Sequence, residues 1–389
     1  MGLFFELIRV ALDNVSCLSR SPSESEWGIL YALAKKQSLV GVCFAGVQKL
    51  QVQQQSPPEM LYLQWMGMAA KIQQRNEVVN RQCADLQNRL ADCGFRNCIL
   101  KGQGVAALYR VGSRCSDSLN GLSSSSSMNE GSQTPLNSSN TSNLSNLRQS
   151  GDIDVWIEGG LDATLALCKK LGQKADVTEQ HVHLHMFHDT EVEGHYVPTR
   201  VMNPLVDKKL QRWIDSQQER QFANRDANGL CTPTAEFNLV YLLVHLYRHL
   251  FHEGVGLRQV MDYYFVLKSS TVADRKNAIQ TIRELGLENF AGGVMYVLRV
   301  VFGSIDDLVI CPQNDRHGKF LLNEIMLSGN MGHSDERLAG MDRSSGFKRF
   351  WLVTCHNMRL LTYYPAEVLW GPIARISLWI WRTKNGYRK

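Results

Sequence analysis

Apolar positions recur at helical spacing near the start of the chain and again toward its end. Between Glu26 and Leu50 this spacing predicts two helices, and from Glu59 to Cys93 it predicts one long amphipathic helix. From Ala235 onward the spacing is again helical almost to the last residue. We therefore expect a helical N-terminal region, residues 1–94, and a helical C-terminal region, residues 206–389.

Shorter apolar stretches between these two regions have the spacing of strands. Arg96–Leu100 and Gly151–Ile157 each predict a strand, the second with alternating apolar residues. His181–His188 and Glu191–Val197 predict an antiparallel pair of strands. The sequence thus predicts an α+β fold in which residues 95–205 form a small mixed sheet with flanking helices.

One segment inside this α/β region has a very different composition. Residues 113–149 are dominated by Ser and Asn and contain an unbroken serine run, Ser123–Ser127. Such a composition buries too little apolar surface to offset the entropy that ordering the chain would remove. We expect residues 113–149 to be a disordered insertion.

Charge and cysteine usage narrow the class of protein only slightly. The 42 basic and 37 acidic residues leave a formal net charge of +5, which is no strong nucleic-acid signature. Ten cysteines are scattered without a C-x-x-C pair, as is typical of a reduced, cytoplasmic protein.

The most apolar candidate for a membrane span, Leu369–Trp381, is interrupted by Pro372 and Arg375. We expect a cytoplasmic protein without a membrane span, in which this segment is an amphipathic helix packed on the body.

Two aspartates in the predicted strand Gly151–Ile157 are the first candidates for chemistry. Asp152 and Asp154 are two residues apart, so their side chains point to the same face of the strand. Two like charges side by side are costly unless a cation lies between them, and Mg²⁺ or Mn²⁺ prefers carboxylate oxygens. Glu193, on a later predicted strand, adds a third carboxylate. The pattern predicts a metal site, although a solvated Asp-x-Asp at the end of a strand remains the alternative.

A glycine-containing turn, Lys101-Gly102-Gln103-Gly104, lies between a predicted strand and a predicted short helix. Gly102 and Gly104 would let backbone N–H groups approach the phosphates of a nucleotide at the start of that helix. The alternative is a simple tight turn. No complete Walker A motif and no nucleotide-binding G-x-G-x-x-G motif is present in the sequence.

Three motifs follow one another along the chain: Leu100-Lys101-Gly102, Arg148-x-Ser150-Gly151-Asp152-Ile153-Asp154-Val155 and Val192-Glu193-Gly194-His195-Tyr196. This ordered set resembles the uncharacterised bacterial nucleotidyltransferase family of the polymerase-β-like superfamily. The segments around Trp27 and Gly254 also resemble flanking helices of that family, so the similarity covers most of the chain outside residues 113–149.

The resemblance implies a polymerase-β-like core and a metal-dependent transfer of a nucleoside monophosphate from an NTP to a hydroxyl acceptor that the sequence does not identify. It implies roles for these residues: Asp152, Asp154 and Glu193 as metal ligands; Lys101, Gly102, Gln103 and Gly104 at the triphosphate; Arg148 facing a phosphate; His249, Arg258 and Asp262 closing the cleft. His195 shares a face with Glu193 and could orient a carboxylate or contact the acceptor.

Two departures from the family pattern keep a second hypothesis open. The usual Gly-Gly or Gly-Ser turn appears here as Gly102-Gln103-Gly104, and the insertion separates this turn from the aspartates. A catalytically inactive nucleotide-binding or interaction module of the same fold is therefore the alternative. Arg258 and Asp262, four residues apart on one helix, could equally form a surface ion pair.

Histidines suggest a third class, a zinc hydrolase. His181, His183 and His185 alternate along one predicted strand and could bind a transition metal, or could simply form a polar, exposed face. His245 and His249 have the spacing of the zinc-protease motif H-E-x-x-H, but Leu246 replaces the general-base glutamate. A zinc hydrolase that uses His245 and His249 is therefore disfavoured.

Overall fold

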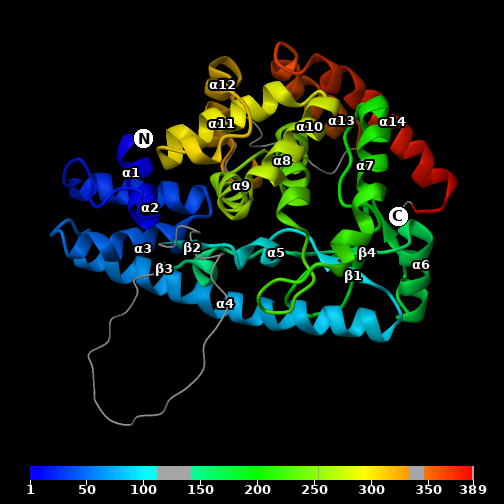
Figure 1. Cartoon of the computed structure of the whole chain (residues 1–389), viewed down its shortest axis with the longest axis horizontal. Helices are drawn as coiled ribbons and strands as arrows, with labels where there is room; N and C mark the ends of the chain where they lie inside the picture. Colours follow the sequence, from blue (N-terminus) through cyan, green and yellow to red (C-terminus); the bar gives the residue numbers. More distant parts are fainter. Residues whose placement is uncertain (112–141, 253, 333–345, 388–389) are drawn as a thin grey trace, which may run out of the picture.

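The computed structural model describes residues 1–111, 142–252, 254–332 and 346–387 (Figure 1). The α-helices of these residues are α1 (Gly2–Ala11), α2 (Glu24–Lys36), α3 (Val40–Gln51), α4 (Glu59–Asp92), α5 (Gln103–Ala106), α6 (Gly160–Lys170), α7 (Pro204–Ala223), α8 (Ala235–His252), α9 (Leu257–Ser269), α10 (Val272–Glu284), α11 (Glu288–Phe302), α12 (Asp315–Ser328), α13 (Gly346–Asn357) and α14 (Pro365–Lys384). The described residues before β1 and after β7 thus form mainly α-helices.

The strands form one small mixed sheet and one two-stranded ribbon. Their bounds are β1 (Asn97–Ile99), β2 (Arg110–Val111), β3 (Ser142–Asn143), β4 (Ile153–Ile157), β5 (Asp176–Val177), β6 (His181–Leu184) and β7 (Val192–His195). The sheet order is β1-β4-β7-β6-β5, with β4 and β7 parallel and the other pairs antiparallel; β2 pairs with β3. The predicted α+β class and the antiparallel pairing of β6 with β7 are confirmed.

The alternation of side chains along β4 explains how this sheet is covered on both faces. Ile153, Val155 and Ile157 belong to a core that includes the second half of α4 and part of α6. Trp156 points to the opposite face, where its ring packs on Phe222 of α7 and on Phe237 of α8. Because both faces are buried, β4 is apolar except for Asp154. That aspartate lies on the face covered by the C-terminal helices.

The N-terminal and C-terminal helices share a single hydrophobic core, although they are far apart in the sequence. Figure 1 shows α1, in blue, close to α11, in yellow, and the long helix α4 running beneath both the N-terminal helices and the sheet. Arg9 of α1 donates to the carbonyl oxygens of Val300 and Val301, at 2.5 and 3.1 Å. Residues from α1 to α3 and from α8 to α12 belong to the same apolar cluster. The N-terminal helices therefore stabilise the C-terminal ones.

The predicted insertion, 113–149, is only partly within the described residues. Its last eight residues, 142–149, are ordered: they contain β3 and a short 3₁₀ helix, Ser145–Leu147. The prediction of disorder was wrong for this part, because Leu144 and Leu147 are buried and Asn76 of α4 donates to the carbonyl oxygens of Asn146 and Arg148, both at 2.7 Å. A composition dominated by Ser and Asn concealed these two apolar anchors. The rest of the predicted insertion, 113–141, lies outside the described residues.

The predicted C-terminal amphipathic helix corresponds to α14. Only part of it is packed on the body: Glu367, Val368 and Gly371 are buried, whereas Leu369 and Ile373 are more than half exposed. Within the described residues, no helix has the length and apolar character needed to cross a membrane.

Candidate functional site

The register of two strands, β4 and β7, brings two of the candidate carboxylates together. Asp154 of β4 is paired with Glu193 of β7, and Trp156 is paired with His195. Directly paired residues of neighbouring strands have their Cβ atoms roughly 5 Å apart and point to the same face. Asp154, Glu193 and His195 therefore share one face, and their ligating atoms lie within 4.8 Å of one another.

Asp154 is the centre of this cluster. Its side chain is only 1% exposed, and its Oδ1 accepts a hydrogen bond from His195 Nε2 at 2.8 Å. The same oxygen lies 3.2 Å from Nζ of Lys101, which is 4.0 Å from Asp152 Oδ2. His195 Nε2 also lies 3.2 Å from Glu193 Oε2. Oδ2 of Asp154 is buried and has no hydrogen-bond partner in the structure.

The ionisation of the cluster follows from burial and from these contacts. Burial alone lowers the pKa of His195, but hydrogen bonds to Asp154 and Glu193 outweigh it and raise this pKa to about 9. Burial likewise lowers the pKa of Lys101, but Asp154 and Asp152 outweigh it and hold the pKa above its ordinary value. Burial raises the pKa of Glu193, but the hydrogen bond from His195 and the charges of His195 and Lys101 together outweigh burial and lower this pKa. At neutral pH two cations thus lie among these carboxylates.

Asp152 lies where two pockets meet. It directly precedes β4 and its side chain is 31% exposed. On the inner side is a cavity of about 30 Å³, lined among others by Lys101 and Asp154. On the outer side is a more open pocket of about 470 Å³, lined among others by Arg75 and Glu193. The open pocket is the larger space beside the carboxylates.

The glycine turn is only partly directed toward this site. Gly102 has a φ of +63° and lines the inner cavity. Gln103, by contrast, is buried and its amide donates to Asn80 of α4. A Cβ added to Gly104 would lie 2.5 Å from the carbonyl oxygen of Ile99, so this glycine allows close packing on β1. Neither Gln103 nor Gly104 lines either pocket.

Arg148 lines the inner cavity but is held by a carboxylate. Its Nε and Nη2 donate to Oδ1 and Oδ2 of Asp262, both at 2.7 Å, and Tyr109 donates its hydroxyl to the same carboxylate at 2.6 Å. All three side chains are buried. Arg258, which could have paired with Asp262 at the surface, is instead buried and donates Nη1 to the carbonyl of Gln149 at 2.8 Å. Its Nε has no hydrogen-bond partner in the structure.

One histidine of α8 lies at the inner cavity and a second contacts it. His245 lines the cavity, and its Nε2 is 2.9 Å from Nε2 of His249. Burial, with His249 and Lys101 nearby, lowers the pKa of His245. Among the described residues, two groups of three side chains could hold a metal, and this pair belongs to neither group. The structure thus offers no three-residue zinc set at His245 and His249.

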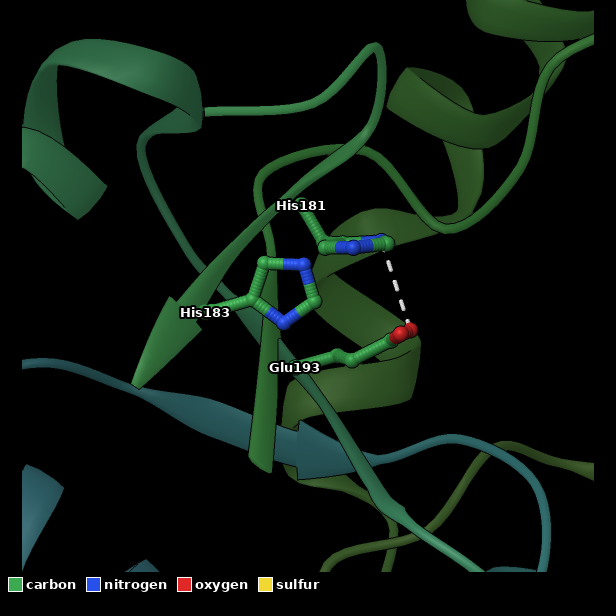
Figure 2. Close-up of side chains that lie close together, drawn as sticks. All are labelled: His181, His183 and Glu193. Carbon is green, nitrogen blue, oxygen red and sulfur yellow. Dashed lines mark ion pairs between the residues drawn. The ribbon is translucent and has the colours of Figure 1, made fainter. Parts of the chain in front are cut away.

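A second group lies next to the first, on β6 and β7. His181, His183 and Glu193 point toward one another in Figure 2. His183 Nδ1 is also 2.9 Å from Glu191 Oε1. Burial, together with His195 and His183, lowers the pKa of His181 to about 3, so its ring is neutral. His185, predicted on the same strand face, follows the end of β6 and is not part of the group.

Sequence reasoning missed Arg75 of α4, which lines the open pocket. Its guanidinium donates to Asp189 Oδ2, to the Asp189 carbonyl and to Thr190 Oγ1, at 2.5, 2.6 and 2.6 Å. It is separated from the carboxylates by a long stretch of sequence, and it is one of many polar residues on an amphipathic helix. No local signal distinguishes it.

A comparison with protein families gives a match over more than half of the chain. The family model described as "Uncharacterised nucleotidyltransferase" matches residues 23–114 and 143–303. These ranges include the carboxylate cluster, the glycine turn, Arg148 and the helices α8 and α9. No curated protein and no solved structure matches the chain. The resemblance seen in the sequence is confirmed, and the chain belongs to this family of uncharacterised nucleotidyltransferases.

Proposed function

We propose that the protein transfers a nucleoside monophosphate from an NTP to a hydroxyl acceptor in a reaction that depends on a divalent metal. Asp152, Asp154 and Glu193 would be the carboxylates of the reaction centre, and the sheet with its helices would be a polymerase-β-like core. The observation that carries the proposal is the adjacency of Asp154 and Glu193 on parallel strands, with Asp152 at the mouth of an open pocket. Family membership supports nucleotidyl transfer.

The residues present fit Mg²⁺ or Mn²⁺. Oδ2 of Asp154 is a buried carboxylate oxygen without a hydrogen-bond partner, and such an atom is costly unless something binds it. Carboxylate oxygens are the ligands that these hard cations prefer. Asp152, Asp154 and Glu193 would hold the metal. When bound, the metal would neutralise charge on the triphosphate and lower the pKa of the acceptor hydroxyl.

An NTP would lie in the open pocket, because a cavity of about 30 Å³ has no room for a triphosphate, and the cationic side chains where the two spaces meet would contact its phosphates. Lys101 is at the junction of Asp152 and Asp154, where its ammonium can contact a phosphate oxygen. Arg258 also lines the cavity, and its buried Nε is unpartnered, as expected of a guanidinium that receives an anion. Arg148, with its carboxylate partner, would position the segment that leads to Asp152. The family resemblance implies that Arg148 faces a phosphate; we propose instead that Lys101 and Arg258 contact the phosphates and that Arg148 holds the chain in place.

His195 would hold a proton between two of the carboxylates. Its Nε2 contacts Asp154 and Glu193, and its Nδ1 is 3.3 Å from the carbonyl oxygen of Val197, which fixes the ring. A proton at Nε2 balances the carboxylate charges. His195 is thus a positioning residue for the carboxylates.

A nucleotide-binding module without turnover is the second candidate. Lys101 and His195 both contact Oδ1 of Asp154 and offset part of the carboxylate charge, so the residues could also serve a site that binds a nucleotide without catalysis. In this case an NTP would bind near Lys101 and Arg258, and no pyrophosphate would be released. Nucleotide binding and pyrophosphate release therefore have to be measured separately.

The test uses purified full-length protein, each of the four labelled NTPs, Mg²⁺ and a cell extract as the source of acceptor. We expect label transfer and pyrophosphate release, both lost in Asp154→Asn and Asp152→Asn and both retained in Asp162→Asn, a matched change of an exposed aspartate on α6. Binding of NTP by the wild type without pyrophosphate release would support the second candidate instead. If the wild type binds no NTP, both candidates fail.

A further inference from the structure

Two neighbouring strands place imidazole groups next to Glu193, one of the carboxylates of the proposed centre. His181 and His183 alternate along β6, so their rings point to the same face. The antiparallel register pairs His183 with Glu193 and His181 with His195. Glu193 is therefore next to His183 on one side and next to Asp154 on the other. Figure 2 shows the two rings and the Glu193 carboxylate facing one another.

The three groups are close enough to share one ion. Their ligating atoms all lie within 4.8 Å of one another, and His181 Nδ1 is 3.3 Å from Glu193 Oε2. Ligands about 2.0 to 2.2 Å from a tetrahedral metal are roughly 3.3 to 3.6 Å apart. The distance from His181 to Glu193 already matches this, and the other pairs would have to close by up to about 1.5 Å. Small side-chain rotations would complete the arrangement. The side chains have room for them, since His181 is 12% exposed, His183 28% and Glu193 17%. The partial exposure leaves a way in for the ion and for a solvent ligand.

His181 also lacks the contacts that a structural histidine normally has. Both of its ring nitrogens are buried, and neither has a hydrogen-bond partner in the structure. His181 Nδ1 lies near Glu193 Oε2, but the two atoms do not have the geometry of a hydrogen bond. A buried ring with two unsatisfied nitrogens is destabilising unless a ligand is bound.

We propose that His181, His183 and Glu193 form a site for one divalent transition-metal ion of the zinc type, which adjoins the carboxylate centre and shares Glu193 with it. Two imidazole nitrogens and one carboxylate oxygen favour Zn²⁺ or Co²⁺, whereas Mg²⁺ prefers oxygen ligands alone. With three protein ligands, the fourth position of the ion is open to water. The site does not depend on nucleotidyl transfer and stands even if the protein does not turn over.

The experiment measures metal binding to the full-length protein after treatment with a chelator. Co²⁺ is followed by its visible absorption, and Zn²⁺ is measured by competition with a chromophoric chelator, with millimolar Mg²⁺ present throughout. We expect one equivalent of each to bind to the wild type. His183→Ala and His183→Gln should weaken binding at least tenfold, and Glu193→Gln should do the same. His185→Ala, which changes an exposed histidine just after β6, should bind like the wild type.

Variants elsewhere distinguish this site from its neighbours. Asp152→Asn should retain the zinc affinity of the wild type even though it abolishes the proposed transfer reaction, so the two proposals can fail separately. If His183→Ala and His183→Gln bind Zn²⁺ as tightly as the wild type, the proposal is wrong. Loss of zinc in Asp154→Asn or in His245→Gln, with retention in both His183 variants, would place the ion elsewhere and also overturn it.

Discussion

The buried pair of Arg148 and Asp262 offers the sharpest test of how the site is held together. Arg148 follows the 3₁₀ helix and precedes the carboxylates, whereas Asp262 is in the middle of α9. Their side chains are 4% and 7% exposed and are joined by two hydrogen bonds of 2.7 Å. Tyr109 adds a third hydrogen bond to the same carboxylate. We expect Asp262→Asn to destabilise the protein strongly, because it leaves the guanidinium buried without an opposite charge.

The expected magnitude follows from this burial. Breaking a buried ion pair by removing one partner costs about 3 to 5 kcal/mol, whereas replacing both partners by neutral groups costs much less. Asp262→Asn alone and Arg148→Met alone should each lower the free energy of unfolding by roughly this amount. The double variant should lose clearly less than the sum of the two single changes. In Asp262→Asn the side-chain amide oxygen can still accept from Tyr109 and from Arg148 Nε, whereas the NH₂ group cannot accept from Arg148 Nη2, so the charge and one hydrogen bond are lost together.

Urea unfolding followed by tryptophan fluorescence measures these differences, provided that the slope of free energy against urea concentration is unchanged. A loss of less than about 1 kcal/mol in both single variants would refute the interpretation of a buried, stabilising pair. Strict additivity in the double variant would refute it as well. If Arg148→Met instead left stability intact and raised the KM for NTP, the guanidinium would be a phosphate ligand after all.

Three further changes test the packing and the ionisation. Gly104→Ala should cost about 1 to 3 kcal/mol in urea unfolding because its Cβ meets the Ile99 carbonyl, whereas Gly67→Ala, with open space around it, should not destabilise. The pKa of His195 is raised from 6.5 to about 9, so protonated His195 stabilises the folded protein fully below pH 6.5, and this contribution is lost as pH rises through about 9. His195→Gln should remove this pH dependence of the free energy of unfolding. Burial raises the pKa of Glu367 from 4.5 to about 7, although backbone N–H groups oppose this, so stability should fall as pH rises from 4.5 through 7. Glu367→Gln should flatten that slope; an unchanged slope would contradict the assignment.

Local patterns were sufficient to predict the elements but not all of their boundaries. The alternation of apolar residues in Gly151–Ile157 predicted β4, and the spacing from Glu59 to Cys93 predicted α4 almost to the residue. The error at residues 142–149 arose because disorder was inferred from average composition, whereas Leu144 and Leu147 are buried against distant helices. Tertiary contacts of this kind leave no trace in local composition.

The spacing of residues alone predicts which side chains lie together only when those side chains follow one another on a single strand. Asp152 and Asp154 were found because two residues on one strand share a face whatever the strand pairs with. The contact of Glu193 with His183 and with Asp154 depends on the register between strands, which one sequence does not specify. Arg75 and Arg258 reach the pockets from helices, and their positions depend on how those helices pack.

The structure also changes what compensates the charge of the carboxylates. Carboxylates crowded on one face do require a compensating cation, and this premise led from the sequence to a metal. In the folded chain part of that compensation comes from the protein itself, through Lys101 at 3.2 Å and His195 at 2.8 Å from the same oxygen of Asp154. Lys101 was expected at a triphosphate and His195 at a carboxylate, and folding brings both to Asp154. Since Oδ2 of Asp154 is buried without a partner, the compensation is incomplete, and that atom is where the structure still favours a metal.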